Sequence, residues 1–228
     1  MKRKNMATMV TCIALVGAVA VGGTLALLTS NTPEVTNTFT IGNGYPATAL
    51  TLDEADVKRV TSGTENFGGY VVDEDAVPAR VVTNDYDNLV ADTTLAKDPT
   101  FHLAADSPDS WVIAKVTGVD ALKAKDITIN GELPGDYGWL KLNIEDGTTT
   151  SITKYADLTD GYYVTKNIVT AGNDTDDLFE ELKVGTNVSR GELENIVVSG
   201  VAVESVTDVW ANDGAAVVAQ ARTAGFIR

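Results

Sequence analysis

The stretch SWVIAKVTG, residues 110–118, decides the fold class because it is apolar on both sides of an extended chain. Trp111, Val112 and Ile113 follow one another without the alternation of a half-buried strand. A short run of this kind, rich in β-branched and aromatic residues and closed by Gly118, is typical of a strand buried on both faces. Such a strand needs packed layers on both sides, so the sequence predicts a β-sandwich core.

Further strands are predicted on both sides of this stretch. They are rich in Val, Ile, Thr and aromatic residues and are separated by Gly, Asp and Asn turn signals. The predicted strands cover residues 35–41, 47–52, 69–73, 80–83, 100–104, 126–129, 139–144, 162–170, 178–184 and 194–206. Residues 53–97 have little periodicity and are predicted mainly as loop.

A helix is predicted only at the two ends of the chain. At the C-terminus, Asp213 is the expected N-cap of a short helix that ends at Gly225. Many short strands and few helices predict an all-β fold, with residues 35–228 forming a single β-sandwich domain.

The N-terminus has the pattern of a signal peptide. A basic start, residues 2–4 (KRK), precedes an uncharged apolar run over residues 6–28, which predicts an N-terminal signal helix. Small residues at Thr24 and Ala26 predict cleavage between Ala26 and Leu27, so residues 1–26 form the predicted signal peptide. A retained transmembrane anchor is the alternative, since about 20 apolar residues can span a bilayer.

Composition narrows the functional classes. The formal net charge is −15, and cleavage after Ala26 removes both the KRK cluster and Cys12, the one cysteine. A secreted mature chain that forms no disulfide points to a bacterial protein. The negative charge disfavours nucleic acid and anionic lipid as partners, so membrane contact is expected only for the precursor.

No residue pattern predicts catalysis. The one histidine, His102, lies between Phe101 and Leu103 in a predicted strand, and the chain contains neither HExxH nor GxSxG. We therefore predict no catalytic residues, no metal site and no cofactor, and we expect His102 to be a polar strand residue that faces outward. The protein is predicted not to be an enzyme.

Two acidic clusters lie in predicted loops, Asp85 with Asp87 and Asp174 with Asp176 and Asp177. Carboxylate oxygens are the ligands that Ca²⁺ prefers, but neither cluster has the ligand spacing and central glycine of an EF-hand loop. We interpret both clusters as solvated loops, with a weak calcium site as the alternative.

Residues 21–44, VGGTLALLTSNTPEVTNTFTIGNG, resemble the N-terminal signature of the TasA/camelysin family. In that family a glycine-rich segment ends in G-T-x-A at the cut made by a SipW-type signal peptidase, and a strand rich in Thr, Asn and Phe follows. Gly23, Thr24 and Ala26 match this cut, with Leu27 as the new N-terminus and residues 36–40 (TNTFT) as the strand. Weaker resemblance continues at residues 97–100, 110–116, 195–203 and 208–211.

The resemblance implies a jelly-roll sandwich that polymerises into fibres of the biofilm matrix. Each subunit would complete its neighbour's sheet with an N-terminal donor strand. The implied donor residues are Leu27, Leu28, Thr29, Ser30, Asn31 and Thr32. The implied partners are other copies of the chain, related fibre or anchor subunits, and the SipW-type peptidase.

The residues themselves are compatible with this role, because cleavage frees residues 27–34 to add to an exposed sheet edge. A disordered mature N-terminus is the alternative, since Pro33 interrupts the segment.

Two other functions compete with a fibre subunit. The first is a monomeric surface adhesin or glycan-binding module, for which Tyr70, Tyr86, Trp139 or Tyr163 would supply an aromatic platform. The second is a secreted metalloprotease, a label that camelysin-like relatives have carried. The single histidine of the chain disfavours it, because zinc enzymes usually need more than one.

Overall fold

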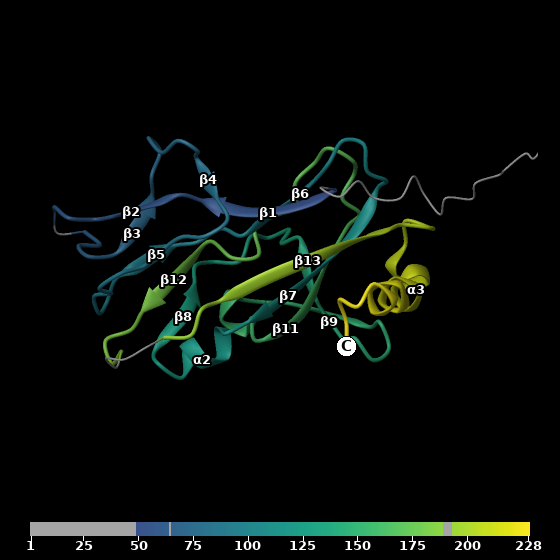
Figure 1. Cartoon of the computed structure of the whole chain (residues 1–228). Coiled ribbons are helices and arrows are strands. Elements are labelled where there is room, and N and C mark those ends of the chain that lie inside the picture. Colours follow the sequence, from purple (N-terminus) through teal and green to yellow (C-terminus); the bar gives the residue numbers. More distant parts are fainter. Residues whose placement is uncertain (1–48, 64, 189–192) are drawn as a thin grey trace, which may run out of the picture. The chain divides into compact units, whose positions relative to one another are not determined.

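The computed structural model describes residues 49–63, 65–188 and 193–228, coloured in Figure 1. Within these ranges most regular structure is strand, arranged in two five-stranded sheets and one three-stranded sheet. This confirms the predicted all-β sandwich with a short C-terminal helix. The predicted signal helix and the predicted strand at 35–41 lie outside the described residues.

The elements are short, and most pair antiparallel. The strands are β1 (Leu50–Ala55), β2 (Val57–Arg59), β3 (Tyr70–Val72), β4 (Arg80–Val81), β5 (Thr94–Ala96), β6 (Thr100–Leu103), β7 (Ser110–Thr117), β8 (Ile127–Asn130), β9 (Trp139–Leu142), β10 (Thr149–Ser151), β11 (Gly161–Thr165), β12 (Glu181–Val184) and β13 (Val197–Glu204). The helices are α2 (Val119–Lys123), the 3₁₀ turn η1 (Tyr155–Asp157) and α3 (Trp210–Thr223). The sheet orders are β4-β1-β6, β10-β9-β11-β7-β13 and β2-β3-β5-β12-β8.

Strand β7 is the centre of the fold, as its sequence predicts. It lies between β11 and β13, and Figure 1 shows it side by side with β13 along the whole length of both strands. Val112 and Ala114 pack into a core cluster that contains Phe101, while Trp111 and Ile113 pack into a second cluster with α3. Val112 and Ile113 are fully buried, so both faces of the strand are covered.

Several predicted strands are longer than the observed ones. The strand expected at 162–170 ends at Thr165, and only a single bridge between Val169 and Ser110 continues it. The strand expected at 178–184 begins at Glu181, although Leu178 is fully buried. Core loop residues are as apolar as strand residues, so composition alone overextends a strand.

Residues 53–97 contain more structure than predicted. Strands β2 and β5 lie entirely within this range, and β5 pairs with both β3 and β12. Strands β2 and β5 have three residues each, which is too few to show an alternation with a period of two. The pairing of β5 with β12 also depends on residues far away in the sequence.

The C-terminal helix begins earlier than predicted. Helix α3 starts at Trp210 with Val209 as its N-cap, so the assignment of Asp213 as N-cap is wrong. The Asp213 carboxylate instead accepts hydrogen bonds from groups preceding the helix, including the backbone N–H groups of Val206 and Thr207. Within the described ranges, no helix has the length and apolar character needed to cross a membrane.

A glycine on β13 allows β6 to pack closely against it. A Cβ atom at Gly200 would lie 2.2 Å from Cε1 of Phe101, which is itself buried. We expect Gly200→Ala to lower the free energy of unfolding by about 1–3 kcal/mol in urea titrations, because the ring must shift within a packed core. Ser199→Ala, at the exposed neighbouring position, is the control and should change it little. Equal effects of the two substitutions would contradict this packing.

Candidate functional site

The residues predicted for cleavage and strand donation, Thr24, Ala26 and residues 27–32, lie outside the described residues. Among the described strands, β13 is the last of its sheet, and its outer side is an edge that could accept a further strand.

Backbone geometry identifies the groups on this side. Ser110 and Val169 exchange two backbone hydrogen bonds of 2.9 Å, so the backbone N–H and C=O of Ser110 point away from β13. Glu204 pairs with Ser110, and opposite residues of an antiparallel pair point their backbone groups either both inward or both outward. Glu204 therefore directs its N–H and C=O groups away from β7.

Every second residue of β13 has this orientation. Val198, Gly200, Ala202 and Glu204 thus present a row of donors and acceptors, which we call the open edge of β13. No backbone hydrogen bond links these groups to another residue in the described ranges. A row of this kind is a template for strand addition.

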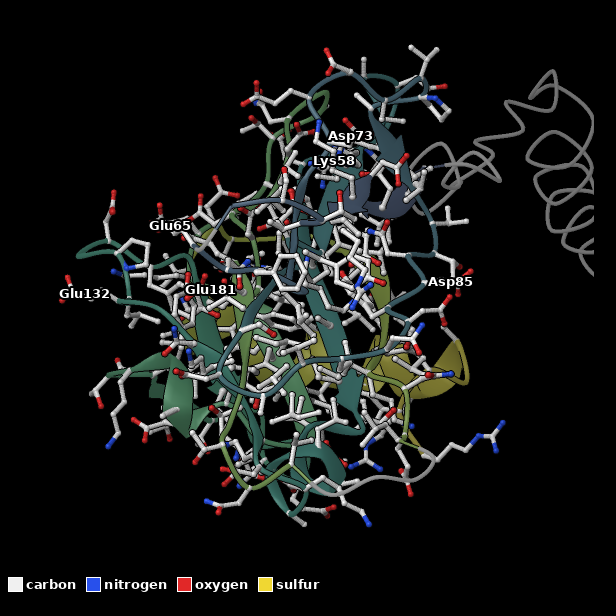
Figure 2. All side chains as sticks on the ribbon, turned by 90° about the vertical axis from the view of Figure 1, so that its left-hand side faces the viewer. Lys58, Glu65, Asp73, Asp85, Glu132 and Glu181 are labelled. Atoms are coloured by element: carbon white, nitrogen blue, oxygen red, sulfur yellow. The ribbon has the colours of Figure 1, made fainter. Side chains whose placement is uncertain are left out.

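A groove of about 500 Å³ lies beside the beginning of β13, bordered by β1 and the segment that follows β4. Its apolar lining includes Leu95 and Leu182, which are buried, and Val198 on the open edge. Its exposed acidic lining includes Asp85, which projects outward in Figure 2, and Glu194. Apolar side chains therefore line part of the groove next to the open edge.

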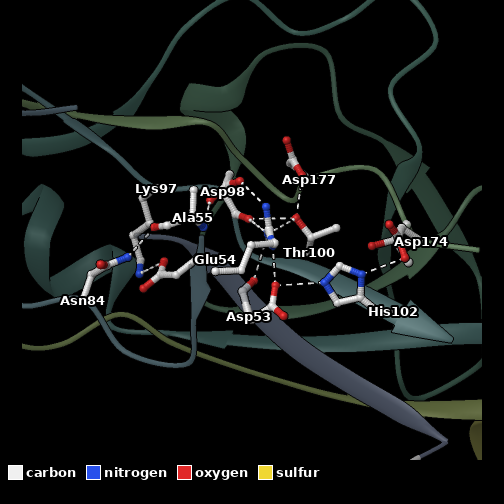
Figure 3. A network of polar contacts seen from close by, with 12 residues as sticks. Asp53, Glu54, Ala55, Asn84, Lys97, Asp98, Thr100, His102, Asp174 and Asp177 are labelled. Carbon is white, nitrogen blue, oxygen red and sulfur yellow. Dashed lines mark hydrogen bonds and ion pairs between the residues drawn. The ribbon is translucent and has the colours of Figure 1, made fainter. Parts of the chain in front are cut away.

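A polar network ties β1, β4 and β6 together (Figure 3). The Arg80 guanidinium donates to the Asp53 carboxylate, to Asp98 Oδ2 at 2.9 Å and to Thr100 Oγ1 at 2.8 Å. Partial burial alone would raise the pKa of Asp53, but hydrogen bonds from Arg80 and His102 outweigh it and lower that pKa. The network holds the three strands of the β4-β1-β6 sheet together next to the groove.

An ion pair borders the groove on the side of this network. Lys97 Nζ lies 2.5 Å from Glu54 Oε2, and their side chains are only 12% and 9% exposed. The ring of Tyr86 lies 5.8 Å from Lys97 Nζ, while the Asn84 side chain donates to the Ala55 carbonyl at 2.8 Å. These contacts hold the side chains on the polar side of the groove in place.

His102 differs from its prediction. It belongs to β6 but does not simply face solvent, because its side chain is 26% exposed and contacts two carboxylates. Nε2 lies 2.9 Å from Asp53 Oδ1, and Nδ1 lies 2.7 Å from Asp174 Oδ1. Partial burial would lower the pKa of His102, but these hydrogen bonds and negative charges raise it.

The two acidic clusters behave differently. Asp85 and Asp87 are exposed, as expected of a solvated loop. The second cluster is not freely solvated, because Asp174 contacts His102 and Asp177 accepts a hydrogen bond from Thr100 Oγ1 at 2.7 Å. Partial burial raises the pKa of Asp177. Within the described ranges, no three acidic, histidine or cysteine side chains are placed to hold a metal ion.

The prediction that these aromatic residues would form an exposed platform for an adhesin is wrong. Tyr70, Trp139 and Tyr163 are buried at 6%, 1% and 0% exposure. Tyr86 is partly buried, and its hydroxyl donates to the Ala96 carbonyl at 2.7 Å. The three buried rings offer no stacking surface, and Tyr86 packs against the core.

Comparisons with known proteins add no relative to this description. No family model, no curated protein and no solved structure matches the chain.

Proposed function

We propose that the chain is a secreted structural subunit of extracellular fibres or pilus-like filaments of a biofilm matrix. Its copies join non-covalently when the N-terminal segment of one copy, freed by signal cleavage, adds as a strand to the next. The open edge of β13 is the observation that carries the proposal. Soluble monomers normally cover, shorten or charge such edges, whereas β13 is eight residues long and mostly apolar.

The acceptor would be the open edge together with the groove at its beginning. Backbone groups of Val198, Gly200, Ala202 and Glu204 would bond the incoming strand, and the groove would take apolar side chains such as Leu27 and Leu28. Main-chain bonds then supply affinity, while side-chain pockets set the register. The side chains of the polar residues Thr29 to Thr32 would point alternately to the two faces of the extended sheet.

The length of the chain permits this exchange. Residues 35–48 separate the donor segment, residues 27–34, from the first described residue, Ala49. An extended chain covers about 3.3–3.6 Å per residue, so this connection can reach about 50 Å. That distance is enough for a donor segment to reach a neighbouring subunit.

The remaining parts of the proposal rest on the sequence. Processing by a SipW-type peptidase at Ala26, and related fibre or anchor subunits as partners, follow from the resemblance of residues 21–44. Secretion follows from the signal pattern, and location in the extracellular matrix or at the cell surface follows from the resemblance. While the signal is attached, the donor segment is held at the membrane, so cleavage would start assembly.

A proline on the open edge tests the acceptor. The Ala202 N–H points outward, so Ala202→Pro removes an edge donor while leaving the hydrogen bonds between β13 and β7 in place. We expect the mature variant to fold, as thermal melting followed by circular dichroism should show, but to remain monomeric by light scattering. Ala202→Val keeps the N–H group and is the matched control, which should polymerise. Filaments of Ala202→Pro as abundant as those of the control would contradict the proposed acceptor.

A further inference from the structure

A segment of the described chain covers the outer edge of β6, whereas no described segment pairs with the outer side of β13. Segment 172–175 lies along the edge of β6 and forms three backbone hydrogen bonds with that strand. Gly172 N–H donates to the Leu103 carbonyl at 3.0 Å, Leu103 N–H donates to the Asn173 carbonyl at 3.0 Å, and Thr175 N–H donates to the Phe101 carbonyl at 2.8 Å. We call residues 172–175 the β6 cover.

His102 connects this cover to the sheet (Figure 3). Its Nδ1 contacts Asp174 of the cover, and its Nε2 contacts Asp53 of β1. A neutral imidazole carries one N–H and can donate to only one carboxylate, whereas an imidazolium donates to both. The two contacts together are therefore those of the protonated ring.

The charges around the ring favour the proton. Asp53 faces it from β1 and Asp174 from the cover, while Arg80 of β4 shares the Asp53 carboxylate. Asp98 contacts Arg80, and Asp177 contacts Thr100, so both carboxylates lie one contact further from the ring. Four carboxylates thus surround one guanidinium and one imidazole.

The two contacts do not depend equally on this proton. Asp53 also contacts Arg80, whose guanidinium stays charged when His102 loses its proton. Asp174 has no second cation within the described contacts, and its side chain is 62% exposed. When the ring loses its proton, Asp174 can therefore turn to water at small cost.

We propose that His102 is a proton-dependent fastener of the β6 cover. As an imidazolium, His102 donates hydrogen bonds to both Asp174 and Asp53 and so links the β6 cover to β1 and β6. As a neutral ring it can donate to only one carboxylate, and the β6 cover then opens more often. The folded pKa of His102 is raised, so the stabilisation is complete below the unfolded value of about 6.5 and is lost as the pH rises through the folded pKa. The inference does not depend on fibre formation.

Native-state hydrogen exchange of the mature protein, at a concentration where it is monomeric, tests this fastener. The probes are the amides of Leu103, Gly172 and Thr175, and the reference is the amide of Val164 in β11. We expect the protection of the probes, relative to the reference, to fall about 2- to 5-fold as the pH rises through the folded pKa of His102, since the Asp174 contact is exposed.

Two variants and one control distinguish an effect of His102 from a general loss of protection across the protein. His102→Gln cannot titrate, so the pH dependence of the relative protection should disappear. Asp174→Asn should lower the pKa of His102 measured by NMR, whereas Asp87→Asn, at an exposed position elsewhere, should leave it unchanged. A relative protection that does not change with pH in the wild type, or that changes equally in His102→Gln, would overturn the proposal. So would a His102 pKa at or below its ordinary value.

Discussion

Replacing Asp213 by alanine is expected to lower the free energy of unfolding by about 3 kcal/mol. Asp213 is 3% exposed, and its carboxylate accepts hydrogen bonds from Trp111 Nε1 at 3.0 Å and Thr207 Oγ1 at 2.7 Å. The substitution leaves the buried Trp111 N–H without an acceptor and frees the turn before α3. Urea unfolding followed by tryptophan fluorescence measures the loss, with exposed Asp85→Ala as a control that should change little.

The pH dependence of Asp213→Asn tests the charge itself. Burial alone would raise the pKa of Asp213, but the hydrogen bonds from Trp111, Thr207 and Ser205 lower it to about 2. Its stabilising contribution is therefore present above the unfolded pKa of about 3.9 and is lost as the pH falls through the folded pKa. Asp213→Asn should be less stable than the wild type at neutral pH, and the two should converge towards pH 2. A gap that stays constant with pH would show that the charge is not stabilising.

Removing residues 27–34 is expected to abolish polymerisation without unfolding the domain. The segment precedes the described sheets, so its removal deletes the donor while leaving the open edge of β13 intact. Light scattering should show monomers for residues 35–228 and large assemblies for residues 27–228. Replacing Leu27 and Leu28 together by Ser is the matched control for side-chain anchoring, and it should weaken assembly without abolishing it, because the backbone hydrogen bonds of the edge remain available.

The central strand could be predicted from the sequence because its burial on both faces is written into its composition. Residues 110–118 need no partner to be recognised, and the structure places β7 between two core clusters. By contrast, β2, β5 and β10 have three residues each, too few for a recognisable pattern. Strands β2 and β10 pair with the neighbouring strands β3 and β9, whereas β5 pairs with the distant strand β12. Local pattern carries no information of this kind.

The open edge and the polar network could not be predicted for a related reason. The apolar character of residues 194–206 predicts a strand, but only the topology shows that β13 is the last strand of its sheet in the described part of the chain. His102 meets Asp53 and Asp174 across separations of 49 and 72 residues. Asp213 was misassigned because an acidic residue near a helix start resembles an N-cap. One of its actual partners, Trp111, is 102 residues away.

Negative-stain electron microscopy of the mature protein tests the central claim most directly. Residues 27–228 and residues 35–228 would be incubated side by side at the same concentration and imaged after equal times. We predict filaments of regular width for residues 27–228 and dispersed single particles for residues 35–228. Dispersed particles in both samples would contradict a fibre subunit, and filaments in both samples would contradict strand donation by residues 27–34.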